Sequence, residues 1–184
     1  MKKILISGAT GFIGKHLVRK LLKQDNIEYL HLVDDLSNSN TIECIDILSD
    51  KKISFFETDV FNFRDNDVPY DQIYHLASPV GPAGVLKYAG KMGKIIVSDT
   101  IKMADLALKN NAKLLAISTS EVYGKDPGNI PQKEDIDKIV PARITVRLEY
   151  GVAKMLSEIA LTNLQRNNSF VFNIIRPFNI VGPS

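Results

Sequence analysis

Two patterns of apolar and polar positions alternate along the chain. Continuous apolar runs, typical of strands buried on both faces of a sheet, occur at residues 3–8, 28–34, 52–58, 71–77, 112–118 and 170–177. Between them, apolar residues recur with helical spacing at residues 12–24, 95–110 and 150–167; the first segment places Ile13, Leu17, Leu21 and Leu22 on one face. This alternation predicts an α/β fold, a parallel sheet with helices on both faces.

Two stretches show neither pattern. Residues 78–93 and 124–143 are rich in glycine, proline and charged side chains. Both are predicted to be loops at the edge of the sheet where ligands bind.

Composition narrows the class of protein further. The 184 residues carry 23 Lys and Arg against 21 Asp and Glu, a net charge of +2, and the basic residues are spread along the chain, which gives no support for nucleic acid binding. The N-terminal apolar run is interrupted too early for a signal peptide, and no run approaches the ~18 apolar residues of a membrane span. With Cys44 as the only cysteine, we expect a cytoplasmic protein without a membrane segment.

The first strand-to-helix turn carries the strongest local motif. Gly8, Gly11 and Gly14 form G-x-x-G-x-x-G between a predicted strand and a predicted helix. Such a turn lets backbone N–H groups and the helix N-terminus meet a pyrophosphate, although the same glycines could serve only a tight turn and close packing. Asp34 ends the second strand, where a carboxylate can bond an adenosine ribose, and no Arg or Lys follows it closely. The motif therefore predicts a doubly wound Rossmann-type sheet that binds NAD rather than NADP.

Polar side chains also cluster where the fifth predicted strand ends. In ISTSEVYG, Thr119, Ser120 and Glu121 follow an apolar run and emerge at the carboxyl edge, where open α/β sheets bind ligands. Tyr150 and Lys154 are four residues apart on a predicted helix and share a face. A nearby ammonium and the positive charge of a nicotinamide would lower the pKa of the tyrosine and make it a usable base. Alternatively, the first group only caps a strand end, and the second is a core tyrosine beside a solvated lysine.

The three histidines are interpreted as structural. His75 is predicted at a buried strand end, and His16 and His31 are treated in the same way. Their spacing is not that of metal ligands, so no metal site is expected.

Taken together, these motifs identify a family. GATGFIG, VDDLSNS, TDV, HLAS, STSEVYG, Y-x-x-x-K and RPFNIVGP occur in the order found in the extended short-chain dehydrogenase/reductases that modify nucleotide sugars, and the resemblance runs from Met1 to Ser184. Within this NAD-dependent epimerase/dehydratase family, HLASP and STSEVYG most resemble the decarboxylases that act on UDP-glucuronate. Arg147 resembles the arginine of their R-x-x-Y-x-x-x-K stretch.

The resemblance implies a role for each matching residue. The implied catalytic residues are Thr119, Ser120, Glu121, Tyr150 and Lys154, and the implied substrate-binding residues are Arg147 and Asn179. The implied cofactor-binding residues are Gly8, Gly11, Phe12, Ile13, Gly14, Asp34, Asp35, Asn38, Ser39, Asp59, Val60, Leu76, Ala77, Ser78, Tyr150, Lys154 and Phe178. The resemblance also implies a homodimer formed through the helices at residues 95–110 and 150–167.

Ser120 and Glu121 bear on the choice of reaction. Dehydratases of the family carry Asp where this chain has Ser120, and a serine is a poor acid for expelling a hydroxyl. Decarboxylation does not need such an acid, since a C6 carboxylate β to a C4 ketone can leave as carbon dioxide. We therefore expect a nucleotide-sugar decarboxylase. A 4-epimerase, which needs no Glu121, and a non-catalytic NAD-binding module stay as alternatives.

Some positions depart from the family pattern. In the helix before STSEVYG, the family usually has an Asn and a Gly-Thr pair; this chain has Ile96 in place of the Asn and Asp99 in place of the Gly, and retains only Thr100. Residues 78–90 also lack the Tyr- and Pro-rich substrate loop of the decarboxylases. Members of the family continue beyond RPFNIVGP into a C-terminal substrate region. We therefore expect residues 1–184 to be an NAD-binding domain with the catalytic residues, taken from a longer chain; a natural short form is the alternative.

Overall fold

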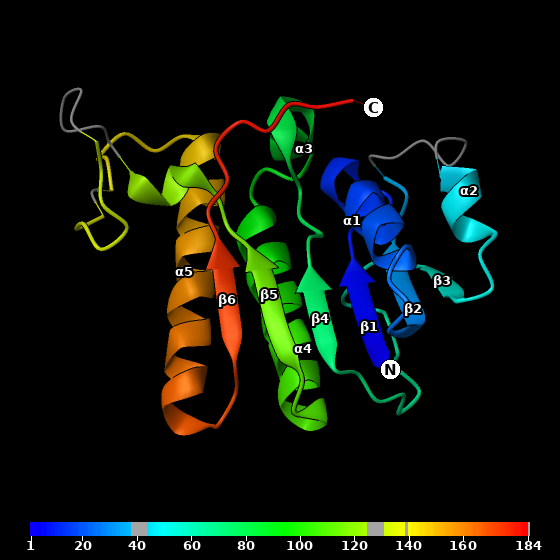
Figure 1. Ribbon diagram of the computed structural model, residues 1–184. Helices are drawn as coiled ribbons and strands as arrows, with labels where there is room; N and C mark the ends of the chain where they lie inside the picture. The colour runs from blue at the N-terminus through cyan, green and yellow to red at the C-terminus, as the bar shows by residue number, and fades with distance from the viewer. Residues whose placement is uncertain (38–43, 125–130, 139, 184) are drawn as a thin grey trace.

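A single parallel sheet organises the molecule. The computed structural model describes residues 1–37, 44–124, 131–138 and 140–183, and within them the strands lie in the order β3-β2-β1-β4-β5-β6 (Figure 1). Their bounds are β1 Lys2–Ser7, β2 Ile27–Asp34, β3 Ile53–Glu57, β4 Gln72–His75, β5 Lys113–Ile117 and β6 Phe172–Ile175. In register, Ser7 lies opposite both Val33 of β2 and His75 of β4. The order reverses beside β1, which confirms the predicted doubly wound Rossmann-type sheet.

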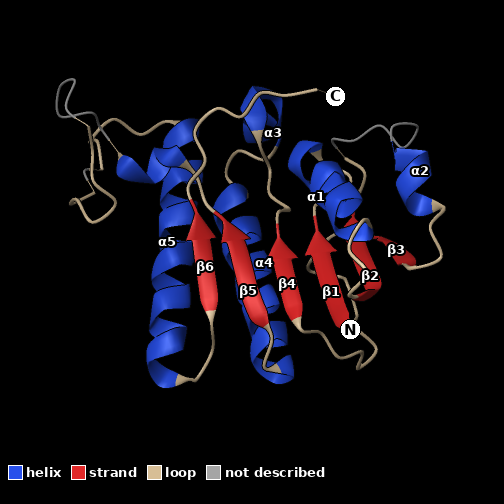
Figure 2. Cartoon of the chain, viewed as in Figure 1, coloured by secondary structure: helices blue, strands red, loops and turns tan. Residues whose placement is uncertain are grey.

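Helices connect successive strands except between β3 and β4, which are joined without one (Figure 2). They are α1 Phe12–Leu22, α2 Ile45–Leu48, α3 Gly81–Lys87, α4 Met92–Asn110 and α5 Val146–Asn167, and the 3-10 helix η2 spans Ser120–Tyr123. The three predicted helices are confirmed, but α4 and α5 each begin a turn earlier than expected. For α5 the cause is Thr145, whose Oγ1 accepts a hydrogen bond from Leu148 N at 3.1 Å and so caps the helix there.

The predicted loop at residues 78–93 is wrong in part. It contains α3 and the first turn of α4. A proline in the first turn of α3 suits a helix start, because the N–H that proline lacks would have no partner there. The described residues of the other predicted loop, at 131–138 and 140–143, form neither helix nor strand.

The two faces of the sheet carry separate apolar clusters. On one face, Met103 and Ala104 of α4 and Leu161 of α5 pack against Leu114 and Ala116 of β5. On the other, Val18 and Leu21 of α1 pack with residues of β1 and β2: Ile4, Ile6, Leu30 and Leu32. Most of these side chains are fully buried, and at about 25 cal/mol per Å² of apolar area they supply the main stabilisation of the fold.

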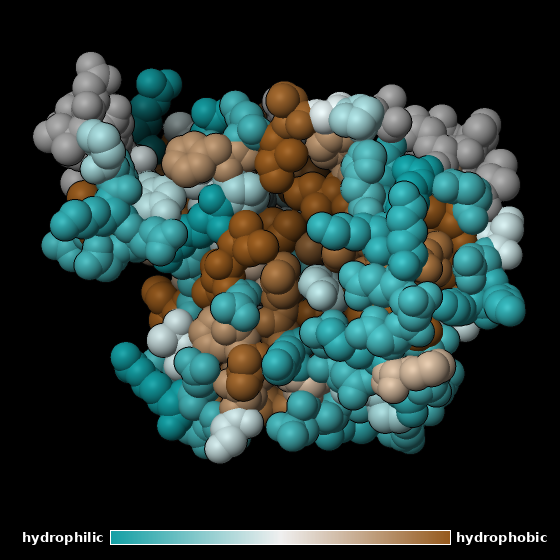
Figure 3. All heavy atoms as spheres, viewed as in Figure 1, coloured by the Kyte–Doolittle hydropathy of each residue, from teal (hydrophilic) through white to brown (hydrophobic). Residues whose placement is uncertain are grey.

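The second face is covered less completely than the first. In Figure 1, α1 lies in front of β1 and β2, whereas no helix lies in front of β5 and β6. Leu115 and Ile117 of β5 are half-buried, and Ile175 of β6 is 47% exposed. Figure 3 shows hydrophobic atoms gathered over the middle of this face. The helices on both faces are thus confirmed, with unequal cover.

Candidate functional site

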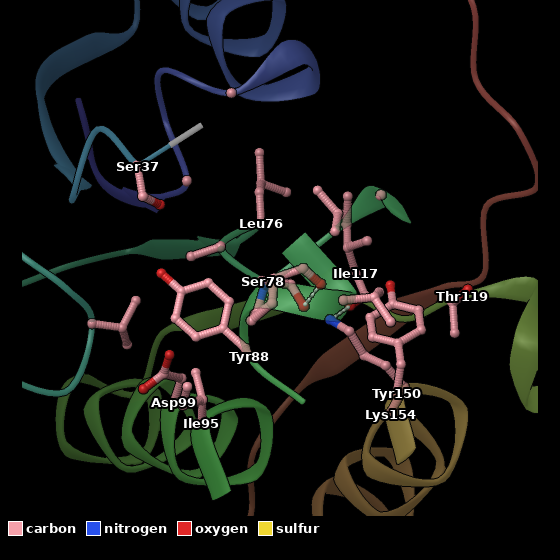
Figure 4. A pocket seen from close by; sticks show the side chains of 18 of the residues that line it. Ser37, Leu76, Ser78, Tyr88, Ile95, Asp99, Ile117, Thr119, Tyr150 and Lys154 are labelled. Carbon is pink, nitrogen blue, oxygen red and sulfur yellow. Dashed lines mark hydrogen bonds between the residues drawn. The ribbon is translucent and has the colours of Figure 1, made fainter. Parts of the chain in front are cut away.

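A large cavity lies at the carboxyl ends of the strands, where the strand order reverses (Figure 4). Its volume is about 1380 Å³. It is lined by the predicted residues Gly8, Gly11, Phe12, Ile13, Gly14, Asp34, Asp35, Asp59, Val60, Leu76, Ala77, Ser78, Thr119, Ser120, Glu121, Arg147, Tyr150, Lys154, Phe178 and Asn179. Asn38 and Ser39, the other predicted residues, lie outside the described part of the chain. The fold therefore brings together, in one place, side chains from every segment on which the motifs fall.

The three glycines of the first turn have different structural roles. Gly8 has a φ of +72°, and a Cβ there would lie 2.5 Å from the backbone N of Ala77. A Cβ on Gly14 would lie 2.1 Å from the carbonyl oxygen of Gly8. These two glycines therefore allow close packing of the turn, α1 and the end of β4, whereas a Cβ on Gly11 would meet nothing closer than 3.4 Å. Gly11 lies at the N-terminus of α1, at the edge of the cavity.

This turn fits the diphosphate and ribose of a dinucleotide. No side chain caps the N-terminus of α1, and its first turn holds no acidic residue, so its N–H groups and helix dipole favour an anion. Beside it, the Asp34 carboxylate accepts hydrogen bonds from Thr10 N and Leu36 N, each at 3.0 Å. These bonds fix the carboxylate, and each oxygen keeps a second lone pair for a ribose hydroxyl. The residues present can therefore hold the cofactor that the sequence predicts.

Lys154 is held at the opposite side of the cavity. It is 3% exposed, and its Nζ donates a hydrogen bond to the carbonyl oxygen of Ile117 at 2.7 Å (Figure 4). Burial lowers the pKa of this ammonium to about 8, and the negative charges of Asp99 and Glu158 oppose that effect. The lysine is therefore still largely charged near neutral pH.

Tyr150 lies one helical turn before Lys154 and bonds Thr119. The pKa of Tyr150 is raised, chiefly by burial; the hydrogen bond with the Thr119 side chain opposes this shift, and the charge of Glu121 adds to it. The pKa of Tyr150 within the folded chain is therefore raised rather than lowered; the expected lowering also counted the positive charge of a nicotinamide and stays a prediction. Burial outweighs the other effects, and the Lys154 ammonium is engaged by a backbone carbonyl instead.

Ser120 and Glu121 form the start of η2. Thr119 caps this short helix, its Oγ1 accepting from Glu121 N at 3.3 Å, so local backbone bonding accounts for part of the polar cluster. Ser120 N donates to Pro177 O at 3.0 Å, which ties η2 to the segment after β6. The Glu121 carboxylate lies 3.6 Å from the Arg147 guanidinium, whose side chain is 76% exposed.

The histidines have the structural roles expected of them. His75 is buried, its Nδ1 lies 2.8 Å from Ser7 Oγ, and its Nε2 lies 3.4 Å from Thr100 Oγ1. Burial lowers its pKa to about 3, so the ring is neutral. His16 and His31 bond Pro183 O and the Tyr70 hydroxyl. Among the described residues, no three His, Cys, Asp or Glu side chains gather as a metal site.

One wall of the cavity was missed by the sequence motifs. It consists of Tyr88, Lys91, Lys94, Ile95, Ser98 and Asp99, at the end of α3 and on the first turns of α4. Their spacing of three and four residues would have indicated a helical face if α4 had been predicted to begin at Met92. Asp99 was noted only as a departure from the family pattern.

The fold and the cavity define a dinucleotide-binding domain of Rossmann type. The chain belongs to the NAD dependent epimerase/dehydratase family, whose model matches residues 4–184. The cofactor that names the family is the one expected from the glycine turn and Asp34. No helix within the described residues is long and apolar enough to cross a membrane.

Individual relatives are nucleotide-sugar enzymes. UDP-glucuronic acid decarboxylase 5 of Arabidopsis thaliana is 35% identical over 182 residues, which cover 98% of this chain and 52% of the relative. Among solved structures, UDP-N-acetylglucosamine 4-epimerase from Methanobrevibacter ruminantium M1 shares the fold, with a TM-score of 0.84 and 23% identity, covering 99% of this chain and 56% of that one. UDP-glucuronic acid 4-epimerase from Bacillus cereus, solved with NAD, has a TM-score of 0.74 and 25% identity, covering 94% and 55%. The chain thus spans about half the length of these relatives.

Proposed function

We propose that this chain carries the cofactor-binding and catalytic residues of an enzyme that modifies a nucleotide sugar through a 4-keto intermediate, and that the reaction is decarboxylation of UDP-glucuronate. One observation carries the proposal: Thr119, Tyr150 and Lys154 line the same cavity as the glycine turn, together with Ser120 and Glu121. The identity to UDP-glucuronic acid decarboxylases over nearly the whole chain supports the choice of reaction.

The glycine-turn side of the cavity is proposed to hold NAD. The N-terminus of α1 would bind the diphosphate, and Asp34 the adenosine ribose, with Asp35, Asp59, Val60, Leu76, Ala77, Ser78 and Phe178 along the remainder of the cofactor. NAD, when bound, supplies an acceptor for a hydride. A 2′-phosphate would face the Asp34 carboxylate, and no Lys or Arg occurs between Asp34 and Lys51 to compensate for it.

The opposite side is proposed to manage protons. The Tyr150 phenolate would take the proton of the sugar 4-hydroxyl as that carbon is oxidised, while Thr119 donates a hydrogen bond to the 4-oxygen and orients it. Because burial raises the pKa of Tyr150, the phenolate needs nearby positive charge. Lys154, buried one turn away, would supply it.

Ser120 and Glu121 are proposed to act after this oxidation. The C6 carboxylate is then β to the C4 ketone, so the C5–C6 bond breaks, its electrons pass into the ketone, and carbon dioxide leaves. A proton must then return to C5. Glu121 and Ser120 would orient the carboxylate and manage that proton, and Arg147 and Asn179 would contact the nucleotide phosphates or the sugar.

Product analysis tests the reaction. The longest protein encoded by the reading frame, given UDP-glucuronate and NAD, should release carbon dioxide. Glu121→Gln should suppress this release and leave NAD affinity unchanged, because Glu121 is not among the proposed cofactor contacts. Ser120→Asp should be still more harmful, since a second carboxylate would repel the substrate carboxylate in a poorly solvated site.

A 4-epimerase is the second candidate. The fold is shared with 4-epimerases, and Thr119, Tyr150 and Lys154 are sufficient to form a 4-ketose whose hydride returns to the other face. If the protein inverts C4 of a UDP-hexose, releases no carbon dioxide and tolerates Glu121→Gln, the epimerase replaces the decarboxylase.

Cofactor preference is tested on the chain itself. Calorimetric titration should show tighter binding of NAD than of NADP. Asp34→Ala should weaken NAD binding by about 1 to 3 kcal/mol, the scale for a buried charge-assisted hydrogen bond. Equal or tighter binding of NADP would contradict the role proposed for Asp34. If the chain bound neither dinucleotide, the decarboxylase and the epimerase proposals would both lose support.

The homodimer and the cytoplasmic location stay predictions. For the dimer, α5 offers Val152, Leu156 and Ile159, which recur at helical spacing and are 39%, 50% and 50% exposed. This stripe is apolar enough to pack against a second copy. Light scattering with and without Leu156→Glu measures whether it does so.

A further inference from the structure

Asp99 is a buried carboxyl group that the proposed reaction does not use. It lies on α4, is 9% exposed and lines the cavity; in Figure 4 its carboxyl group rises from α4 into that space, near Tyr88. No hydrogen bond or ion pair reaches its carboxylate from the residues that the structure describes. A carboxyl group in this position normally has a partner, because an unpaired buried charge is costly.

The charges around Asp99 do not supply that partner. Asp59 after β3 and Asp35 after β2 face it with negative charge. The nearest cations are already engaged: Lys102 Nζ donates to Phe61 O and Phe63 O at 2.5 and 2.6 Å, and Lys154 Nζ donates to Ile117 O. Both still act on Asp99 electrostatically.

The balance of these effects favours the neutral acid. Burial raises the pKa of Asp99 to about 7, the charge of Asp59 adds to the rise, and Lys102 and Lys154 oppose it. Near neutral pH the group is therefore divided between its two forms. A ligand that prefers one of them shifts the proton equilibrium.

We propose that Asp99 is a further cofactor-binding residue, that it faces the bound dinucleotide as the neutral acid, and that binding takes up a proton there. This inference rests on the proposed binding of NAD in the cavity. The diphosphate brings negative charge into a space that Asp59 and Asp35 already make negative. The neutral acid can donate a hydrogen bond to a phosphate or ribose oxygen, whereas the carboxylate can only repel the phosphate.

The sign of the pH dependence follows from linkage. Binding of an anion raises the pKa of Asp99 above its value in the free protein, so the complex holds more protons than the free chain above about pH 7. Affinity must therefore fall as pH rises. A further rise of about one unit in the complex would weaken NAD binding about fivefold between about pH 6 and 8.

Calorimetry of the chain with NAD measures both quantities. Titrations at about pH 6, 7 and 8, each in two buffers of different ionisation enthalpy, should show the fall in affinity and an uptake of about half a proton between pH 7 and 8. Binding with constant affinity and no proton uptake would overturn the role of Asp99 alone. Absence of NAD binding at every pH would overturn the proposed cofactor function, and this inference with it.

Two variants distinguish the titration of Asp99 from that of Lys154, whose pKa of about 8 also lies near the range of pH used in these titrations. Asp99→Asn keeps the shape of the neutral acid and cannot titrate, so its affinity should stay near the wild-type value at about pH 6 over the whole series. Asp105→Asn changes an exposed carboxylate of the same helix and should retain the wild-type pH dependence. A pH dependence that persists in Asp99→Asn would belong to Lys154 and would overturn the proposal.

Discussion

The two walls of the cavity are built in different ways. The glycine-turn wall, formed by Gly8, Gly11, Gly14 and Asp34, is defined by backbone: its glycines leave no room for a Cβ at two positions, and its carboxylate is fixed by two N–H groups. The second wall, formed by Thr119, Tyr150 and Lys154 and called the catalytic wall for its proposed role, is defined by side chains, and burial has shifted the pKa values of Tyr150 and Lys154. Substitution of Gly8 or Gly14 in the first wall should therefore damage the fold, and change in the second wall should damage the chemistry.

The largest effect is expected on the catalytic wall. Tyr150→Phe removes one hydroxyl, so turnover in the proposed reaction should fall by about a hundredfold to ten-thousandfold, the scale of a positioned acid or base, while NAD affinity and thermal stability change little. Steady-state kinetics with UDP-glucuronate and titration with NAD measure the two effects. Retained turnover would show that another group takes the proton. Tyr29→Phe, which removes a hydroxyl outside the cavity, serves as the control.

On the glycine-turn wall the expected effect is on folding. Gly14→Ala places a methyl group 2.1 Å from the Gly8 carbonyl oxygen, so backbone must move, and we expect a loss of about 2 to 4 kcal/mol in the free energy of unfolding. Gly93→Ala, on α4, is a matched control, because the added Cβ would meet only Glu149 Oε1, at a distance of 3.9 Å. It should stabilise the protein by up to about 1 kcal/mol. Urea denaturation of both variants measures the difference; equal stabilities would mean that the turn can relax.

Asp99 belongs to neither wall but lines the cavity from α4, and it tests how strongly burial shifts a pKa in the cavity. Its pKa is raised to about 7 from 3.8, so between these values the folded chain holds a proton that the unfolded chain does not, and stability falls as pH rises. Asp99→Asn escapes this loss. Its gain in stability over wild type should be about 2 kcal/mol larger at about pH 8 than at about pH 5.5, at about 1.4 kcal/mol per pH unit below 7. Thermal denaturation at both pH values measures the gain, and an equal gain at both would show that the carboxyl group is not held neutral by the fold.

What could be predicted from the sequence follows the same division. The glycine turn, Asp34 and the pairing of Tyr150 with Lys154 are local patterns at strand ends and on one helix, and they were placed correctly at the cavity. The part of the wall around Tyr88 was missed because α3 is a short helix whose glycines and proline resemble a loop, whereas Asp99 lies within the predicted helix and was noted only as a departure from the family pattern. The raised pKa of Tyr150 could not be predicted either, because burial depends on packing between segments distant in the chain.

The smallest effect on stability is expected at Arg147, where the catalytic wall meets solvent. Its side chain is 76% exposed and lies 3.6 Å from a Glu121 carboxylate that is itself 39% exposed, so solvent screens the pair. Arg147→Met should change the free energy of unfolding by less than about 0.5 kcal/mol, because exposed ion pairs contribute little. In the proposed reaction the same change should weaken UDP-glucuronate binding severalfold, since an exposed guanidinium whose pairing with Glu121 contributes little to stability can bond an anionic substrate. Arg143→Met, an exposed arginine that does not line the cavity, should alter neither quantity. A loss of stability above about 1 kcal/mol in Arg147→Met would instead show that this side chain belongs to the packing of the wall, and the distinction between the two walls would fail at that position.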